Sequence, residues 1–252
     1  MLFAAGLGTR LRPLTDHTPK ALVEVGGVPI LERVARRVIA AGADRLIVNV
    51  HHFAEQVEAY VRARDGWGVE VVFSREEGAP LETGGGLLRA EPLFRKDAPF
   101  IVHNADILTD LPLREMYAAH RESGALATLA VMERETSRHF LFDDRGLLGR
   151  TDARKGLELR ARPAEGPVRK LAFGGVHVIS PEFFPLVTER GAFSILDPYL
   201  RLAGEGERIL PFRVDGALWL DIGSPAQLEA ARRAVECSLP DHPPLGEGSR
   251  SG

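Results

Sequence analysis

The sequence predicts an α/β fold, in which a mixed, mostly parallel central sheet carries helices on both faces. Short, continuously apolar segments alternate with longer amphipathic segments along the chain, as strands and helices do in such folds. Because the predicted strands are apolar throughout, helices must cover the sheet on both sides. Polar motifs follow several of these strands, and ligands in open parallel sheets bind beyond the carboxyl ends of the strands.

The predicted strands are the apolar segments, and the first of them leads directly into a glycine-rich loop. In chain order they are Leu2–Ala5, Leu46–Val50, Val69–Phe73, Phe100–His103, Leu126–Val131, Leu171–Ile179 and Leu218–Leu220. The carboxyl ends of such strands bring the loop Gly6–Lys20, the segment Asn104–Asp106 and the side chain of Asp221 to one rim of the sheet.

The segments between these strands have helical periodicity. The apolar face of Pro29–Ala41 consists of Ile30, Leu31, Val34, Val38 and Ala41, whereas Glu32, Arg33, Arg36 and Arg37 are expected to face water. Pro29 at the start and Gly42 just beyond the end are typical of helix termini. Phe53–Arg64 repeats the pattern, and Ser224-Pro225-x-Gln227 predicts a capped start for the last helix.

Two segments depart from this alternation. Residues 143–170 are rich in Arg, Gly and Asp, which favours a hairpin followed by a long loop that serves as a lid or binding loop. Residues 238–252 contain several prolines and glycines, and we expect a disordered tail there. The prediction is therefore one domain over residues 1–237, followed by the tail.

The composition excludes several classes of protein. The chain has 252 residues, 44% of them hydrophobic, and a formal net charge of −3, so nothing draws it over long range to nucleic acid or to an anionic membrane. No segment approaches the ~18 consecutive apolar residues of a membrane-spanning helix. Cys237 is the only cysteine, which rules out a disulfide within the chain and fits a reducing cytoplasm.

The loop after the first strand is suited to binding phosphates. Gly6 and Gly8 let the backbone turn sharply and aim its N–H groups at an anion, and Arg10 and Lys20 supply full positive charges. The loop is not a dinucleotide-binding fingerprint, because Leu11 occupies the position of the third glycine. Nor is it a Walker loop, because Ala21 rather than Ser or Thr follows Lys20. A glycine turn with two solvated cations remains the alternative.

Two carboxylates follow apolar strands and could share a metal ion. Asp106 ends Phe100-Ile101-Val102-His103-Asn104-Ala105-Asp106, and Asp221 ends Leu218-Trp219-Leu220-Asp221. Either one alone is equally well explained as a turn residue. Two carboxylates at one rim can hold Mg²⁺, which prefers hard oxygen ligands and completes its shell with water and substrate phosphates.

The loop motif resembles a known family signature. Gly6-x-Gly8-Thr9-Arg10-Leu11-x-Pro13-Leu14-Thr15-x-x-x-Pro19-Lys20 is similar to the signature of the sugar-1-phosphate nucleotidylyltransferases. Within that family the chain resembles the N-acetylmuramate 1-phosphate uridylyltransferase-like group, also described as mannose-1-phosphate guanylyltransferase-like. The marks of this group are Pro80–Gly86, Asn104-x-Asp106, Phe173–Gly175 and Gly191-Ala192-Phe193.

The resemblance covers roughly residues 1–231 and implies a Rossmann-like nucleotide-diphospho-sugar transferase fold. It also implies transfer of a nucleotidyl group from an NTP to a sugar 1-phosphate, with release of pyrophosphate. Members of the family usually carry a longer first strand than Met1-Leu2-Phe3, so we expect the true start of this protein a few codons upstream.

The resemblance assigns roles to individual residues. Arg10, Lys20 and Asp106 are predicted to be catalytic, and Mg²⁺ is the implied cofactor, with Asp106 and Asp221 as its ligands. The predicted nucleotide-binding residues are Ala4, Ala5, Gly6, Leu7, Gly8, Thr9, Arg10, Glu82, Thr83 and Gly84. The predicted sugar-phosphate-binding residues are Lys20, Asn104, Gly175 and Asp221. Residues 143–170 then become a sugar-site insertion.

Resemblance around Pro80–Gly86 favours UTP with N-acetylmuramate 1-phosphate or a related amino-sugar 1-phosphate. A lactyl group on the sugar would require a cation, and Arg150, Arg154, Arg160 and Lys170 are available in the insertion. GTP with mannose 1-phosphate is the alternative, because a carboxylate such as Glu82 matches the two adjacent donors of guanine well.

Two other functions remain open on this fold: a regulatory nucleotide- or sugar-binding module, and a phosphocholine cytidylyltransferase-like enzyme. The first predicts a lost metal pair or a missing Lys20, and the second predicts an aromatic cage. Neither is visible in the sequence. The expected partners are the NTP and the sugar 1-phosphate, without nucleic acid or membrane, and a homodimer is left open.

Overall fold

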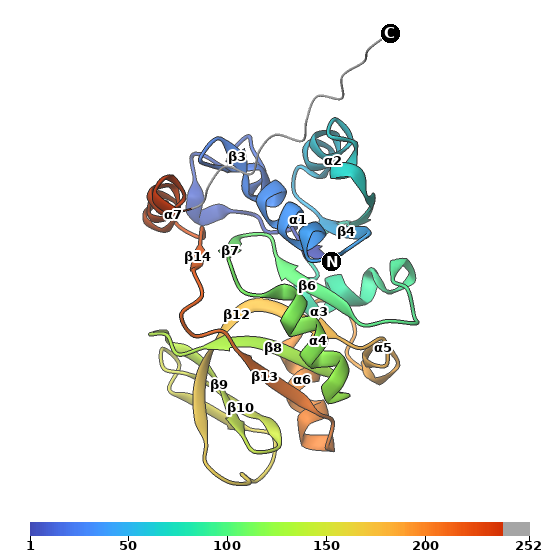
Figure 1. Cartoon of the computed structure of the whole chain (residues 1–252), viewed down its shortest axis with the longest axis vertical. Coiled ribbons are helices and arrows are strands. Elements are labelled where there is room, and N and C mark those ends of the chain that lie inside the picture. Colours follow the sequence, from blue (N-terminus) through green and yellow to red (C-terminus); the bar gives the residue numbers. More distant parts are fainter. Residues whose placement is uncertain (239–252) are drawn as a thin grey trace.

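The computed structural model describes residues 1–238 and confirms the predicted α/β fold class (Figure 1). A 10-stranded sheet has the order β11-β10-β9-β12-β6-β1-β4-β5, with β8 beside β12 and β13 beside β8. Its strands are β1 (Leu2–Phe3), β4 (Arg45–Val50), β5 (Glu70–Arg75), β6 (Phe100–Asn104), β8 (Ala127–Met132), β9 (Arg138–Asp143), β10 (Gly146–Asp152), β11 (Leu157–Arg160), β12 (Arg169–Ile179) and β13 (Ile209–Arg213). Two small sheets pair β2 (Glu24–Val25) with β3 (Val28–Pro29), and β7 (Ile107–Thr109) with β14 (Trp219–Asp221).

The N-terminal part of the sheet is parallel, as predicted. β1 lies between β4 and β6, with Leu2 opposite Val48 on one side and His103 on the other. Just beyond β1, the Ala4 N–H donates to the Asn49 carbonyl over 2.9 Å, and the Ala105 N–H donates to the Phe3 carbonyl over 3.1 Å. These bonds bring the glycine-rich loop to the carboxyl ends of β4 and β6.

The part of the sheet formed by β9, β10, β11 and β12 is antiparallel and more regular than the sequence suggested, whereas β13 pairs with β8 in parallel. Residues 143–170 were predicted as a hairpin and a long loop, but β10 pairs with both β9 and β11. Leu147 and Leu148 of β10 are fully buried, so this segment contributes to the core in spite of its many charged residues.

Helices cover both faces of the sheet, as predicted. They are α1 (Ile30–Ala40), α2 (Ala54–Arg62), α3 (Glu82–Arg89), α4 (Leu113–Ser123), α5 (Phe183–Leu186), α6 (Leu196–Glu205) and α7 (Pro225–Ser238). Val48 of β4 packs in one core with α1, α2 and α4, whereas its neighbour Ile47 packs in a second core with α3 and α6. Successive strand side chains therefore serve opposite layers.

One expected solvent-facing residue of α1 is buried. The apolar face of α1 is as predicted, but Glu32 is only 7% exposed. It accepts hydrogen bonds from Tyr60 (2.6 Å) and Arg36 (2.8 Å), and it forms an ion pair with Arg64. Burial raises the pKa of Glu32, but these hydrogen bonds outweigh it and hold the pKa below its usual value. Periodicity missed this role because α2 packs over the polar side of α1.

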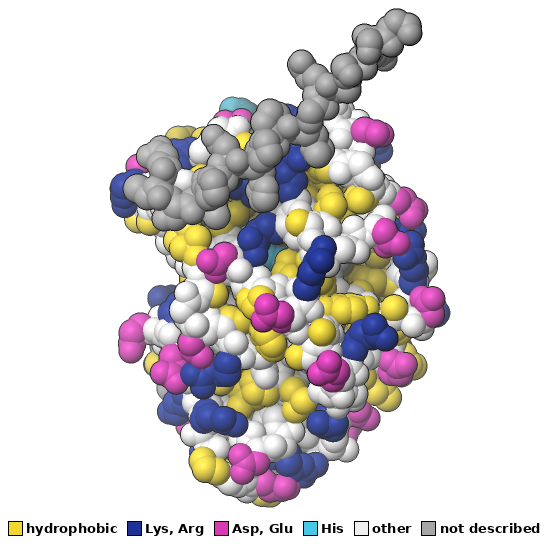
Figure 2. Space-filling model, viewed as in Figure 1, with side chains coloured by type: hydrophobic (Ala, Val, Ile, Leu, Met, Phe, Trp, Pro, Cys, Tyr) yellow, Lys and Arg dark blue, Asp and Glu magenta, His cyan; other side chains and the backbone are white. Residues whose placement is uncertain are grey.

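The last helix begins as the sequence indicated. Ser224 Oγ donates to Gln227 Oε1 over 2.8 Å, and it accepts from the Gln227 N–H at the first turn of α7. Residues 239–252, which make up the predicted disordered tail beyond Ser238, lie outside the described residues. Among the described helices, none is long and apolar enough to cross a membrane. Figure 2 shows Lys and Arg interspersed with Asp and Glu over one face, in keeping with the small net charge of −3.

Candidate active site

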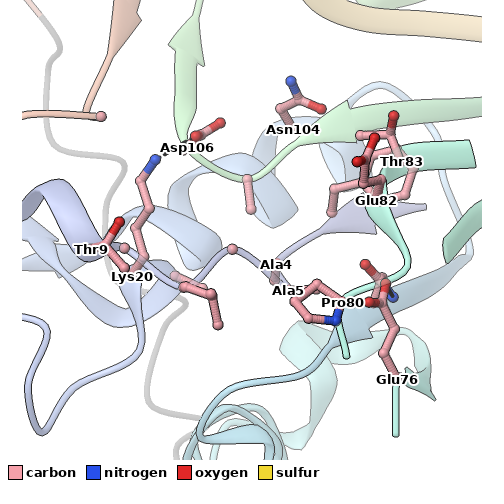
Figure 3. A pocket seen from close by; sticks show the side chains of 18 of the residues that line it. Ala4, Ala5, Thr9, Lys20, Glu76, Pro80, Glu82, Thr83, Asn104 and Asp106 are labelled. Atoms are coloured by element: carbon pink, nitrogen blue, oxygen red, sulfur yellow. Dashed lines mark hydrogen bonds and ion pairs between the residues drawn. The ribbon is translucent and has the colours of Figure 1, made fainter. Parts of the chain in front are cut away.

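A cavity of about 460 Å³ lies at the carboxyl ends of the parallel strands, where the sequence placed the site (Figure 3). Three segments that are distant in sequence meet there: the loop after β1, the start of α3, and the end of β6. The lining residues are Phe3, Ala4, Ala5, Gly6, Leu7, Gly8, Thr9, Arg10, Lys20, Ala21, Asn49, Glu76, Pro80, Glu82, Thr83, Asn104, Ala105, Asp106 and Gly223. Most of the predicted site residues are therefore brought together.

The glycine-rich loop is held in a tight turn. Gly8 has φ +66°, a left-handed conformation that side chains disfavour, and a Cβ at this position would lie 2.9 Å from Thr15 Cγ2. Thr15 Oγ1 donates to the Gly8 carbonyl over 2.8 Å, which fixes the loop from the inside. The chain then forms the 3₁₀ helix η1 (Thr9–Leu11), which carries Arg10.

Arg10 reaches across to the segment that follows β14. A Cβ on Gly223 would lie 2.5 Å from the Arg10 guanidinium and 2.9 Å from Asp221 Oδ1. Gly223 therefore leaves room for the guanidinium to approach the backbone beside Asp221. Arg10 and Lys20 thus both reach this end of the cavity, where two carboxylates, Asp106 and Asp221, are also close.

Lys20 and Asp106 form an ion pair in the cavity. Lys20 Nζ lies 2.5 Å from Asp106 Oδ2, and Figure 3 shows the two side chains pointing at each other. The Lys20 side chain is 12% exposed and that of Asp106 is 34% exposed, so the pair stands at the wall of the cavity in reach of a ligand. The cation paired with the Asp106 carboxylate is thus the ammonium group of Lys20.

The second carboxylate comes close through the small β7–β14 sheet. Asp221 is opposite Ile107, the neighbour of Asp106, and the Ile222 N–H donates to the Asp106 carbonyl over 3.1 Å. Asp221 is not among the lining residues; its Oδ1 accepts from the Gly223 N–H (2.7 Å) and its Oδ2 from Gln227 Nε2 (3.2 Å).

These residues suit a divalent cation that keeps part of its own shell. Among the described residues, no three His, Cys, Asp or Glu side chains gather around one point. Asp106 and Asp221 are therefore at most two protein ligands for a metal ion; Asp106 also pairs with Lys20, and both carboxylate oxygens of Asp221 accept hydrogen bonds. Mg²⁺ is usually bound in this way, with water and substrate phosphates as the remaining ligands.

The segment from Pro80 to Gly86 forms the opposite wall, but its residues differ in role. Pro80, Glu82 and Thr83 line the cavity. Gly84 does not: its N–H donates to the Phe193 carbonyl, and a Cβ there would lie 2.3 Å from the Phe193 ring. The lack of a side chain at Gly84 lets α3 pack against the segment before α6.

Asn49 and Glu76 line the same cavity and were missed by sequence reasoning. Glu76 is 6% exposed and Asn49 is 1% exposed. Glu76 Oε1 accepts from Asn49 Nδ2 over 2.9 Å, and Glu76 Oε2 accepts from the Leu81 N–H over 2.7 Å. The carboxylate thereby ties the end of β4 to the residue that precedes α3. The one available signal was a polar residue, Asn49, within an apolar strand.

One predicted sugar-side residue, Asn104, lies at the end of β6, and a second, Gly175 of β12, is beside it. Asn104 lines the cavity, and Gly175 of β12 has φ +79° with a would-be Cβ 3.2 Å from Asn104 Nδ2. Gly175 itself is not a lining residue. His103 is buried, its Nδ1 lies 2.8 Å from the Asn104 carbonyl, and burial lowers its pKa to about 4. It is therefore a neutral core residue at physiological pH.

Residues 143–170 do not line this cavity. Of the cations expected there, Arg160 pairs with Glu158 at 2.8 Å on an exposed strand. The strongest interaction of the segment is internal, because Arg162 donates two hydrogen bonds of 2.6 Å to the buried carboxylate of Asp143. That bidentate pair holds the pKa of Asp143 far below its usual value.

With the geometry established, comparison with known proteins identifies the family. The family profile described as nucleotidyl transferase matches residues 1–238. The chain belongs to the nucleotidyl transferase family. It is an enzyme of that class, as the glycine-rich loop indicated.

Relatives agree with the resemblance found in the sequence. N-acetylmuramate alpha-1-phosphate uridylyltransferase of Caulobacter vibrioides is 36% identical, over 94% of this chain and 96% of the relative. Mannose-1-phosphate guanyltransferase of Yarrowia lipolytica is 30% identical, over 89% of this chain and 60% of the relative. The structure of UDP-glucose pyrophosphorylase from Acinetobacter baumanii has a TM-score of 0.72 at 20% identity and covers 97% of this chain and 94% of that one, which supports the fold.

Proposed function

We propose that this nucleotidyl transferase uses Mg²⁺ to transfer a nucleotidyl group from an NTP to a sugar 1-phosphate, giving an NDP-sugar and pyrophosphate. The observation that carries the proposal is that the Lys20–Asp106 pair and the loop Gly6–Thr9 line one cavity. A phosphate-binding loop, a lysine ammonium group on a flexible side chain and a carboxylate are groups that serve a displacement at phosphorus.

The chain supplies positioning and positive charge, and no general base is needed. A sugar phosphate with a second pKa near ~6 is largely dianionic at neutral pH and attacks the α-phosphorus directly. Lys20 neutralises the α-phosphate and the incoming phosphate as their oxygens approach. Arg10 and the N–H groups of Gly6–Thr9 hold the β- and γ-phosphates, which leave as pyrophosphate. Mg²⁺ on Asp106 and Asp221 would supply further charge neutralisation between the two substrates.

Lys20 has two partners in this scheme. In the structure its ammonium group is bound to Asp106 at 2.5 Å. Its four-carbon side chain can swing toward a phosphate, which leaves the Asp106 carboxylate free for a metal ion.

We further propose UTP and N-acetylmuramate 1-phosphate as the preferred substrates. The uridylyltransferase relative is more similar than the guanyltransferase relative and is matched over 96% rather than 60% of its length. Glu82 lines the cavity and is compatible with either base, since a carboxylate accepts one N–H from uracil or two from guanine. GTP with mannose 1-phosphate is the second candidate and rests on Glu82 and on the guanyltransferase relative.

A substrate screen tests the proposal. Purified protein with Mg²⁺ is given UTP or GTP together with N-acetylmuramate 1-phosphate, N-acetylglucosamine 1-phosphate or mannose 1-phosphate, and pyrophosphate release is followed. The highest kcat/KM is expected for UTP with N-acetylmuramate 1-phosphate, and excess chelator should abolish turnover. A clear preference for GTP with mannose 1-phosphate would favour the second candidate, and turnover in chelator would remove the metal from the scheme.

A further inference from the structure

The strand β11 forms an exposed edge of the large sheet. It lies at the end of the strand order, paired with β10 on one side, and no described strand pairs with its other side. All four of its residues are exposed, including Leu157 (36%) and Leu159 (43%). An exposed edge of this kind has unpaired backbone N–H and C=O groups that can hydrogen-bond to another strand.

Several common protections of such edges are absent from β11, although the strand is short, with four residues. Edge strands commonly avoid association through short length, charged side chains, proline or a bulge. β11 contains no proline, its pairing with β10 has no register shift, and its charged residues Glu158 and Arg160 have opposite signs. The strand is therefore electrostatically complementary to itself.

Symmetry restricts how two copies of β11 can pair. Opposite residues of an antiparallel pair point to the same face of the sheet, so a two-fold axis perpendicular to the sheet must place some residue opposite itself. An axis at Glu158 would oppose like charges, and so would an axis at Arg160. With the axis at Leu159, Glu158 of each copy lies opposite Arg160 of the other copy, which gives two pairs of opposite charge. The two Leu159 side chains then lie next to each other.

A cavity beside the strand suits the same register. Leu159, Ala161 and Leu200 form the apolar part of a hollow of about 310 Å³ between β11 and α6, whose other lining residues are Arg160, Asp197, Arg201 and Gly204. With the axis at Leu159, Leu157 of the partner subunit lies opposite Ala161, at the mouth of this hollow. An apolar side chain that is exposed in the single chain is thereby placed next to apolar atoms.

We propose that two copies of this chain associate through antiparallel pairing of β11, with the two-fold axis at Leu159, so that one sheet runs through both. In the single chain Glu158 and Arg160 pair with each other at 2.8 Å, and in the dimer each exchanges this partner for its counterpart in the other copy. The strands β10, β9, β12 and β6 separate this edge from β1, so the pairing is independent of the proposed reaction.

Charge reversal with mixing tests the interface. Sedimentation velocity at concentrations up to about 100 μM should show a dimer for the wild type, a range chosen because interfaces of small area are weak. Glu158→Arg and Arg160→Glu should each raise the dimer dissociation constant by about tenfold or more, since each opposes like charges twice. An equal mixture of the two variants should again dimerise, because every pair is then of opposite sign.

The controls separate this interface from other outcomes. The double variant Glu158→Arg/Arg160→Glu should dimerise like the wild type, and Glu77→Arg, at a side chain that is 85% exposed, should not change association. Circular dichroism checks that each variant is folded. A monomeric wild type, single variants that dimerise like the wild type, or a mixture that stays monomeric would each overturn the proposal. None of these measurements uses substrate, so their results do not depend on whether the proposed function is correct.

Discussion

Replacement of Glu76 by Ala tests whether the missed carboxylate positions the nucleotide side of the cavity. Glu76 accepts one hydrogen bond from Asn49 and one from the Leu81 N–H, the residue before α3. The variant removes both acceptors, which leaves the Leu81 N–H without a protein partner and the buried Asn49 amide with only its 3.4 Å hydrogen bond to the Ser74 carbonyl. The wall formed by Glu82 and Thr83 then loses its link to β4.

The size of the effect follows from the two bonds. Each is a bond to a charged acceptor and contributes about 1.5–3 kcal/mol. Because the Leu81 N–H is only partly buried and can bond water instead, we expect a total loss of about 3 kcal/mol in the free energy of unfolding. For a chain of this size, that loss corresponds to a fall in Tm of roughly 6–12 °C. A loosened wall should raise KM for the NTP by about tenfold and change kcat less.

Thermal unfolding and steady-state kinetics measure both effects, and the adjacent residue gives the control. Glu77 is 85% exposed and pairs with Arg89 only at 3.7 Å, so Glu77→Ala should change stability by less than about 0.5 kcal/mol. Glu76→Gln should recover much of the loss, because its carbonyl accepts from Leu81 while its amide donates to a turned Asn49 side chain. If Glu76→Ala behaves like Glu77→Ala in both assays, the carboxylate does not hold this wall.

Three further predictions concern the proposed reaction and the antiparallel part of the sheet. Lys20→Ala should lower kcat and kcat/KM together by about 10²-fold or more, as loss of a transition-state cation does, and near-normal kinetics would contradict the placement of the phosphates. Asp106→Asn and Asp221→Asn should each remove most turnover with little change in Tm, and full activity in either would refute the metal pair. Asp143→Asn should cost about 3–5 kcal/mol of stability because Arg162 then loses its buried counter-charge, and an unchanged Tm would refute this. Since folding lowers the pKa of Asp143, its stabilising effect is present above the unfolded pKa near ~3.9 and is lost as pH falls below it, which acid titration of wild type against Asp143→Asn should show.

The positions of candidate site residues were predictable where a local motif fixes the backbone. The loop from Gly6 to Lys20 needs its glycines for backbone conformation, and Gly8 does adopt a left-handed φ of +66°. Asp106 was predictable because a carboxylate after a buried strand must lie at the rim of a parallel sheet. The apolar periodicity likewise placed α1 and the central strands.

Features that depend on distant partners could not be read from the chain. Glu76 is one of two adjacent glutamates, and only the folded positions of Asn49 and Leu81 distinguish it from Glu77. Glu32 follows helical spacing that points to water, yet α2 covers it. Gly84 belongs to a motif assigned to the base, but the Phe193 ring occupies the space beside it. Each depends on packing between segments that are far apart in sequence.

The most direct test of the proposed function measures the amounts of both products, UDP-sugar and pyrophosphate, that form in one reaction. The protein is incubated with Mg²⁺, UTP and N-acetylmuramate 1-phosphate, and phosphorus NMR follows UDP-sugar and pyrophosphate together, beside Asp106→Asn as the inactive control. Equal amounts of the two products in the wild type, and neither in the variant, are the predicted result. Pyrophosphate formed with UMP in place of UDP-sugar, or no turnover with any pairing of nucleotide and sugar 1-phosphate, would contradict the assignment of this cavity to nucleotidyl transfer.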